Sequence, residues 1–140
     1  PNHFELELLA GREARDHSAL RAALAHVLGR GPGCALATSL VTAETPEGFL
    51  DMAACDARGL YLLRTPRLDA SFHGAGDVTA ALFLAHLLRG RGAREALSLA
   101  GSSLAGLLRR TVADGGGELA LVAAQDEFVT PSILLQAEPL

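Results

Sequence analysis

The stretch that decides the fold is Phe72-His73-Gly74-Ala75-Gly76-Asp77-Val78-Thr79-Ala80-Ala81-Leu82-Phe83. It places three small residues beside one acid, and an apolar run of helical period follows. Gly74 and Gly76 allow backbone conformations and close approaches that a Cβ would prevent. The first amides of a helix have no partner within it, and the helix dipole adds partial positive charge there. The stretch therefore predicts a turn that opens directly into a helix, with an anion site suited to phosphate at its start.

Asp77 is the unusual residue of this stretch, because a carboxylate inside a phosphate site repels the ligand unless it has a chemical task. A suitable task is to accept the proton of a hydroxyl group that attacks the phosphate. A second interpretation is structural, since Asp is a common helix N-cap and Gly is common in the turn before it. The twelve residues alone leave both interpretations open.

Composition narrows the class of protein. The 140 residues, of which 49% are hydrophobic and 20% charged, suffice for one domain with a core, or for part of a larger one. With a net charge of −4 and no basic stripe, neither nucleic acid nor an anionic membrane is an expected partner. All 12 basic residues are arginine, and the absence of lysine excludes a Walker-type P-loop and Schiff-base chemistry within this chain.

Cys34 and Cys55 show neither metal-ligand spacing nor a C-x-x-C pair, so we expect buried, reduced thiols. Reduced thiols favour a cytoplasmic location. No apolar run reaches the roughly 18 residues that a membrane-spanning helix needs. The only methionine is Met52, and the chain starts at Pro1 within an expected helix, so its start is interpreted as a cut.

Periodicity and turn residues predict an α/β chain. The expected helices cover residues 1–11, 19–28, 78–88 and 93–113, and the expected strands cover residues 34–41, 49–55, 59–65 and 119–123. Asn2 and Glu5 have the spacing of a capping box at the first helix. We expect the first strand to be buried in a parallel sheet and the next two to form a hairpin at a sheet edge. We expect residues 66–73 to form an irregular loop. The helix over residues 78–88 should be buried on several sides. So few strands indicate part of a larger three-layer α/β/α sheet.

Four segments, taken in order, resemble the C-terminal half of bacterial pyridoxal (pyridoxamine) kinases, in the ribokinase-like superfamily. They are Pro1-Asn2-His3-Phe4-Glu5, Ala37-Thr38-Ser39-Leu40, Gly74-Ala75-Gly76-Asp77 and Leu121-Val122-Ala123-Ala124-Gln125-Asp126. The third is similar to the superfamily's G-x-G-D signature. The fourth, together with Gly101-Ser102-Ser103, favours pyridoxal kinase over a sugar kinase. The resemblance implies that residues 1–140 are the C-terminal ATP-binding and catalytic half of a single kinase domain.

The resemblance also implies roles for individual residues. Asp77 matches the catalytic base, which contacts the substrate and takes a proton from the 5′-hydroxymethyl group of the vitamin. The amides of Gly74, Ala75, Gly76 and Asp77 match the anion hole for the transferring phosphoryl group. Glu5 and Asn2 match the magnesium position, and Glu5 also lies near the ATP phosphates in that match. Thr38 and Ser39 match residues that contact the ATP phosphates. A loop beside the nucleotide, where the alignment is loose, is matched by Arg64, Thr65, Pro66 and Arg67.

Two residues depart from the family pattern. Ala75 stands where Thr or Ser is common, which removes a possible hydrogen bond to phosphate, and His73 stands where an aliphatic residue is usual. The resemblance implies an ATP- and Mg²⁺-dependent kinase for pyridoxal, pyridoxine or pyridoxamine that is a homodimer at full length, and it leaves a monovalent cation open. The alternatives are a hydroxymethylpyrimidine or sugar kinase of the same superfamily, or a non-catalytic nucleotide-binding fragment. We expect the isolated chain to have little kinase activity.

Overall fold

The computed structural model describes residues 1–68, 72–115 and 117–140. The chain divides into two compact units, one formed by Pro1–Arg67 with Ala137–Leu140 and the other by Leu68–Gln136. Part of the loop expected over residues 66–73 therefore lies outside the described residues. The two units are described separately below.

The first unit contains a four-stranded sheet with the strand order β1-β2-β3-β4. Its strands are β1 (Cys34–Leu40), β2 (Phe49–Asp56), β3 (Gly59–Pro66) and the short β4 (Glu138–Pro139). All neighbouring strands pair antiparallel. The expected hairpin is confirmed as β2 and β3, but it lies inside this sheet and not at its edge, since β1 and β4 flank it.

The expectation of a parallel partner for β1 is wrong for the described sheet, where its ladder partner is the antiparallel β2. The one parallel contact of β1 is an isolated bridge between Thr38 and Asn2. An apolar run such as Cys34–Leu40 shows that a strand is largely covered, but it does not select the direction of its neighbour.

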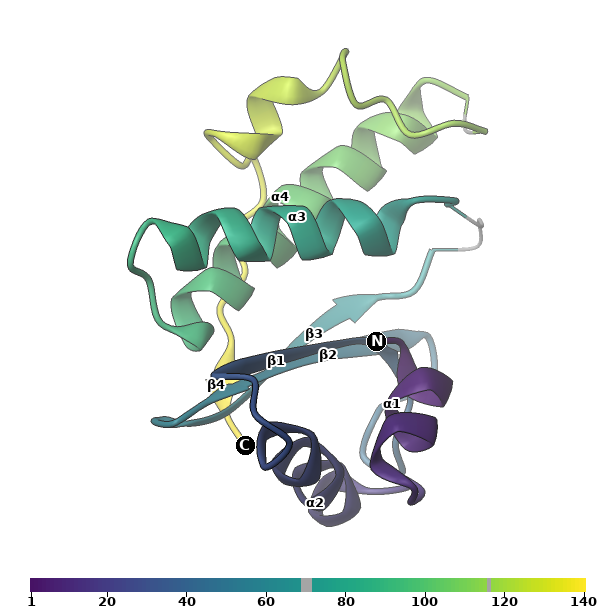
Figure 1. Ribbon diagram of the computed structural model, residues 1–140. Coiled ribbons are helices and arrows are strands. Elements are labelled where there is room, and N and C mark those ends of the chain that lie inside the picture. The colour runs from purple at the N-terminus through teal and green to yellow at the C-terminus, as the bar shows by residue number, and fades with distance from the viewer. Residues whose placement is uncertain (69–71, 116) are drawn as a thin grey trace. The chain divides into compact units, whose positions relative to one another are not determined.

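Two helices, α1 (His3–Ala10) and α2 (His17–Leu28), cover one face of this sheet (Figure 1). Both begin at side-chain caps, since Asn2 and Glu5 form the expected capping box and the Asp16 side chain accepts the Ala19 amide. Helices and strands share one apolar core, whose largest fully buried members are Leu6, Leu20, Leu24 and Leu40.

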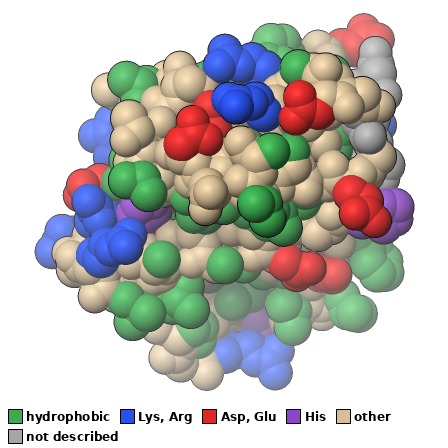
Figure 2. Space-filling view, turned by 90° about the horizontal axis from the view of Figure 1, so that it is seen from above, with side chains coloured by type: hydrophobic (Ala, Val, Ile, Leu, Met, Phe, Trp, Pro, Cys, Tyr) green, Lys and Arg blue, Asp and Glu red, His purple; other side chains and the backbone are tan. Residues whose placement is uncertain are grey.

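The second unit is built on two helices, α3 (Ala75–Leu88) and α4 (Ala93–Ala113), which pack against each other. The bounds of α4 agree with the sequence prediction, whereas α3 begins three residues before the predicted start. The expectation that α3 is buried on several sides is wrong, because its buried residues are only Thr79, Phe83 and His86 while Leu88 is 80% exposed. Hydrophobic side chains are also visible among charged ones on the face drawn in Figure 2.

The strand predicted over residues 119–123 is wrong as well. These residues form turns that lead into the short 3-10 helix η1 (Gln125–Phe128). The Ala120 amide donates to Thr111 Oγ1 of α4 at 3.1 Å, and the Ala124 amide donates to the Ala120 carbonyl at 2.8 Å. An extended apolar run needs a neighbouring strand to complete its hydrogen bonds, and the described part of this unit contains none.

Among the described residues, no helix combines the length and the apolar character required to cross a membrane.

Candidate active site

The first group of predicted site residues is the glycine turn and the start of α3, in the second unit. Gly74 precedes the helix with φ 83° and ψ −4°, in the left-handed region that favours glycine. The Val78 amide donates to the Gly74 carbonyl at 3.0 Å, which is the first bond of the helical pattern. The predicted turn into a helix is therefore confirmed, and glycine at position 74 is required by its backbone conformation.

Free amides remain at this helix start. The Ala75 amide donates to the Phe72 carbonyl at 3.3 Å, so it is partly committed. The amides of Gly74, Gly76 and Asp77 have no hydrogen-bond partner among the described residues. Of the predicted anion-hole donors, Ala75 is thus the weakest, and Gly76 and Asp77 present the free N–H groups that an anion can accept.

The space beside Gly76 is open. A Cβ built at this position would meet no atom within 4 Å, so packing within the protein does not explain the glycine. A helical Cβ tilts toward the N-terminus of its helix. A side chain at position 76 would therefore project toward the region that the free amides face. A ligand bound in that region would explain why this position carries glycine.

Asp77 is exposed and occupies the third helical position. No side-chain cap bond forms at this helix start, and Asp77 makes no hydrogen bond or ion pair with the described residues. The interpretation of Asp77 as an N-cap is therefore wrong, because the N-cap position belongs to Gly74. The carboxylate remains available to accept a proton from outside the chain.

The second group of predicted residues lies at one edge of the sheet in the first unit. Since β1 and β3 are both antiparallel to β2, they run in the same direction and end at the same edge. Thr38 and Ser39 are near the end of β1, and the segment from Arg64 to Arg67 is at the end of β3. The isolated bridge from Thr38 to Asn2 adds the start of α1 to this edge. In α/β sheets, ligands commonly bind beyond the carboxyl ends of strands.

At the start of α1, Glu5 Oε2 accepts the Asn2 amide at 2.8 Å, while Asn2 Oδ1 accepts the Glu5 amide at 2.9 Å. Both side chains are exposed. These two bonds provide acceptors for the amides of Asn2 and Glu5 and keep the carboxylate of Glu5 at the sheet edge. The capping function therefore does not exclude binding of a hydrated metal ion.

Ser39 has a strained backbone. Its φ of 54° places it in the left-handed region, where it is the only non-glycine residue in the described part of the chain. The β1–β2 register shifts between Ala37 and Leu40, so Ser39 lies in a bulge. Such a conformation costs on the order of 1–3 kcal/mol and persists only where the surroundings enforce it, most often at functional sites. Ser39 itself is exposed.

Arg64 is committed within the protein. Its guanidinium makes a bidentate pair with the fully buried Asp51, with Nε 2.8 Å from Oδ1 and Nη2 2.9 Å from Oδ2. The hydrogen bonds from Arg64 to Asp51 raise the pKa of Arg64. Nucleotide binding by Arg64 stays a prediction, but the structure assigns most of this side chain to Asp51. Thr65 Oγ1 lies 3.4 Å from the Leu50 carbonyl, whereas Pro66 and Arg67 are exposed at the edge.

Asp51 was not among the predicted site residues. Its signal was an acid between apolar residues in the strand Phe49–Asp56, opposite Arg64 in the expected hairpin. Cross-strand partners share one face of a sheet, so the ion pair could have been inferred from the hairpin register.

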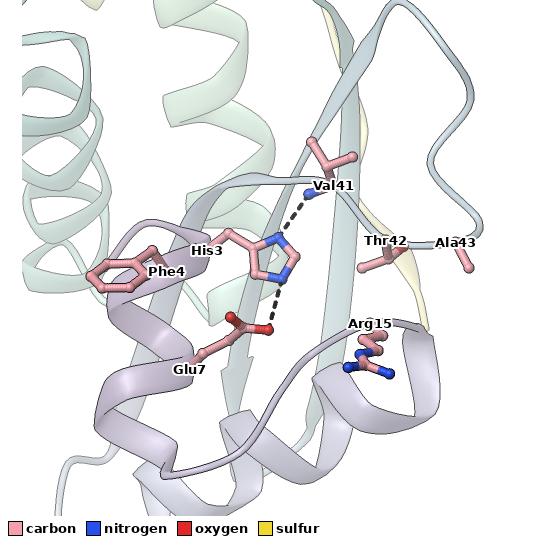
Figure 3. A pocket seen from close by; sticks show the side chains of 7 residues that line it. All are labelled: His3, Phe4, Glu7, Arg15, Val41, Thr42 and Ala43. Carbon is pink, nitrogen blue, oxygen red and sulfur yellow. Dashed lines mark hydrogen bonds and ion pairs between the residues drawn. The ribbon is translucent and has the colours of Figure 1, made fainter.

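An open depression of about 500 Å³ adjoins the β1–β2 connection in the first unit. It is lined by His3, Phe4, Glu7, Arg15, Val41, Thr42 and Ala43. Figure 3 shows His3 between Glu7 and the backbone of Val41; its Nδ1 accepts the Val41 amide at 3.1 Å. His3 was not among the predicted site residues.

Magnesium fits the donor set at the start of α1 only as a partly hydrated ion. The described part of the chain holds no group of three or more His, Cys, Asp or Glu side chains that could bind a metal. Mg²⁺ usually binds one or two carboxylates and keeps several waters, with substrate phosphates as further ligands. Glu5 can supply that carboxylate contact, with Asn2 beside it.

Comparison with solved structures defines the fold class. The chain superimposes over its full length on pyridoxal kinase from Leishmania donovani in complex with ADP and pyridoxine, with a TM-score of 0.85, 24% identity and 50% of that chain covered. Plasmodium falciparum PdxK with the ligands AMP-PNP and PL gives a TM-score of 0.85 at 20% identity, with 100% of this chain and 48% of that chain covered. The chain thus has the α/β fold of these kinases, and the predicted fold class is confirmed.

The sequence defines the family. Residues 1–121 match the family model described as phosphomethylpyrimidine kinase, and the chain belongs to that family. It is 49% identical over 134 residues to pyridoxal kinase PdxY from Rubrobacter xylanophilus, covering 95% of this chain and 46% of the relative. The corresponding protein of Granulibacter bethesdensis is 48% identical over 142 residues, covering 99% and 50%. The resemblance to pyridoxal kinases is confirmed, and the chain spans about half the length of these relatives.

Proposed function

We propose that this chain is the ATP-binding and catalytic C-terminal half of a pyridoxal kinase, which transfers a phosphoryl group from ATP to the 5′-hydroxyl of pyridoxal or a related B6 vitamer. The observation that carries the proposal is the start of α3, where an exposed carboxylate without a partner among the described residues, Asp77, follows the free amide of Gly76. The relatives named pyridoxal kinase PdxY, and the solved kinases with nucleotide and vitamer ligands, support this choice of substrate.

The geometry suits phosphoryl transfer because that reaction depends on positioning and charge stabilisation more than on covalent chemistry. The amides of Gly76 and Asp77 supply fixed donors for the negative charge on the transferring group. One such donor can contribute about 3–4 kcal/mol to the transition state. Asp77 accepts the proton of the attacking hydroxyl, and general-base assistance of this type gives a rate factor of about 10²–10⁴.

The sheet edge of the first unit has the nucleotide-binding role in this proposal. The hydroxyls of Thr38 and Ser39 contact ATP phosphates, and Glu5 with Asn2 holds waters of a bound Mg²⁺. When bound, that ion neutralises negative charge on the β- and γ-phosphate oxygens. Thr65, Pro66 and Arg67 flank the nucleotide at the end of β3. A monovalent cation, a homodimeric assembly and a cytoplasmic location belong to the proposal as attributes of the whole protein.

The decisive experiment is Asp77→Asn in the active protein, meaning this chain joined to the remaining half of the family fold. The variant keeps the size and exposure of the side chain but cannot accept the proton. We expect turnover with pyridoxal to fall at least about 100-fold, while the affinity for ATP stays within a few-fold. The matched control is Asp114→Asn, an exposed acid that follows α4. Near-normal turnover of Asp77→Asn would show that the carboxylate has no part in the reaction.

A second candidate is phosphorylation of a hydroxymethylpyrimidine, which the description of the matching family model favours. Both substrates present a hydroxymethyl group on a nitrogen heterocycle, so Asp77 and the amides would act in the same way. Steady-state rates with the two substrates distinguish them: turnover with the pyrimidine and none with pyridoxal would replace the first candidate by the second.

A further inference from the structure

The loop between β1 and β2 is held by hydrogen bonds along residues 41–45. The Val41 amide donates to His3 Nδ1 at 3.1 Å, and the Ala43 amide donates to the Arg15 carbonyl at 2.8 Å. The Thr45 amide donates to the Thr42 carbonyl at 3.0 Å. This loop follows the strained Ser39 directly, so its position bears on the conformation of the strand end.

A buried carboxylate holds the loop from the sheet side. Thr45 Oγ1 donates to Asp51 Oδ2 at 2.8 Å, and Arg64 Nη2 donates to the Glu44 carbonyl at 2.9 Å as well as to Asp51. Asp51 is fully buried and accepts three hydrogen bonds, of which two come from a cation. Charge-assisted bidentate bonds are short and directional, so they fix the geometry of what they join.

The direction of the hydroxyl bonds follows from donor counting. Thr45 Oγ1 has a single proton, which it donates to Asp51. It therefore accepts from Thr42, whose amide lies 2.9 Å away and whose hydroxyl lies 3.2 Å away. A continuous path of hydrogen bonds thus runs from Asp51 through Thr45 to Thr42, three residues beyond Ser39.

Ser39 is consequently held from both sides. Before it, the Thr38 amide donates to the Pro1 carbonyl at 2.9 Å. After it, Leu40 is fully buried and pairs with Asp51 in the ladder, and the loop is tied to the same Asp51. A left-handed conformation at a serine needs such enforcement on both sides, because otherwise the backbone relaxes.

We propose that Asp51, Arg64 and Thr45, named here the Asp51 cluster, are positioning residues for nucleotide binding: they enforce the backbone conformation of Ser39 at the sheet edge. This inference rests on the proposed function, which assigns Ser39 to the ATP phosphates. It gives Arg64 a role through Asp51 and not through contact with the nucleotide.

The test compares Thr45→Val, Asp51→Asn and Arg64→Lys in the active protein, meaning this chain joined to the remaining half of the family fold. Thr45→Val keeps the shape of a half-buried side chain and removes only the hydroxyl, so it provides a variant that folds even if Asp51→Asn does not. Amide hydrogen exchange at residues 39–45 reports the loop, and calorimetric titration with AMP-PNP and magnesium reports nucleotide affinity. We expect Thr45→Val to speed amide exchange at residues 39–45 and to weaken nucleotide binding by about tenfold. The effects of Arg64→Lys should lie between those of Thr45→Val and Asp51→Asn.

A control separates positioning from general stability. Ala23→Gly removes a methyl group from the buried face of α2, away from the loop, and should lower stability without changing nucleotide affinity. Faster exchange with unchanged affinity in Thr45→Val would overturn the positioning role and leave the proposed function intact. Absence of AMP-PNP binding by the unsubstituted protein would instead count against the proposed nucleotide site itself, and the positioning role would fail with it.

Discussion

Adding one methyl group at Gly76 distinguishes the effect of this position on stability from its effect on activity. A Cβ at this position meets no atom within 4 Å, and the residue is helical without a positive φ. Gly76→Ala should therefore raise the free energy of unfolding by about 0.4–1 kcal/mol, because alanine restricts the unfolded chain. A gain in stability together with a loss of activity would show that glycine at position 76 serves the site and not the fold.

The same methyl group should reduce activity. It projects toward the helix N-terminus, where the amides of Gly76 and Asp77 are free. In the proposed site it would occupy space that a phosphoryl oxygen needs. Loss of one such donor lowers turnover about 10²–10³-fold, which sets the expected size of the effect. Turnover is measured by ADP release with pyridoxal in the active protein, and stability by urea denaturation of the same material.

The matched control is Gly33→Ala, another glycine whose added Cβ would meet nothing within 4 Å. It lies before β1 and should leave turnover unchanged. Unchanged turnover in Gly76→Ala together with higher stability would refute the assignment of the anion to these amides. Lower stability would refute the open space described at this position.

Two further predictions concern the second unit. In Gly106→Ala the new Cβ would clash with Glu127 Oε2. Glu127 can move only by breaking the hydrogen bonds that it accepts from Ser132 Oγ at 2.6 Å and from the Ser132 amide at 2.7 Å, so the free energy of unfolding in urea should fall. A loss of at least about 2 kcal/mol is expected, and unchanged stability would contradict this packing. Burial, and then the charge of Arg91, lower the pKa of His86, so the folded state favours the neutral imidazole. Its stabilising contribution is present above the unfolded pKa, near 6.5, and is lost as the pH falls from there through the lower pKa of the folded state. The decrease in the free energy of unfolding between about pH 7.5 and pH 5.5 should therefore be smaller in His86→Gln than in the unsubstituted protein, and an equal decrease would show that His86 does not titrate in this way.

Local signals in the sequence identified most elements. The capping box of Asn2 and Glu5 and the bounds of α4 follow from side chains that act within a few residues of one another. The β2–β3 hairpin follows from its short turn, because a turn of fixed length sets the register of the strands that it joins. The turn into α3 at Gly74 belongs to the same group.

Local signals failed where the partner of a segment was distant. Residues 119–123 have the composition of a strand, but the described residues of their unit offer turns and Thr111 in place of a neighbouring strand. The antiparallel ladder of β1 is a similar case. Tertiary context overrides intrinsic preference in both, because an extended segment is stable only with a hydrogen-bonding neighbour.

The sequence by itself determined the family and the turn into a helix, and it predicted an anion site there, because the G-x-G-D turn places glycine flexibility, helix amides and Asp77 within four consecutive residues. Only the tertiary structure showed that Asp77 is not the N-cap, that Ser39 is held at positive φ, and that Asp51 binds Arg64 and Thr45 beneath the loop that follows Ser39. The physical reason is sequence separation: Asp51 and Arg64 are brought together by strand pairing, and their hydrogen bonds exist only after the sheet has formed.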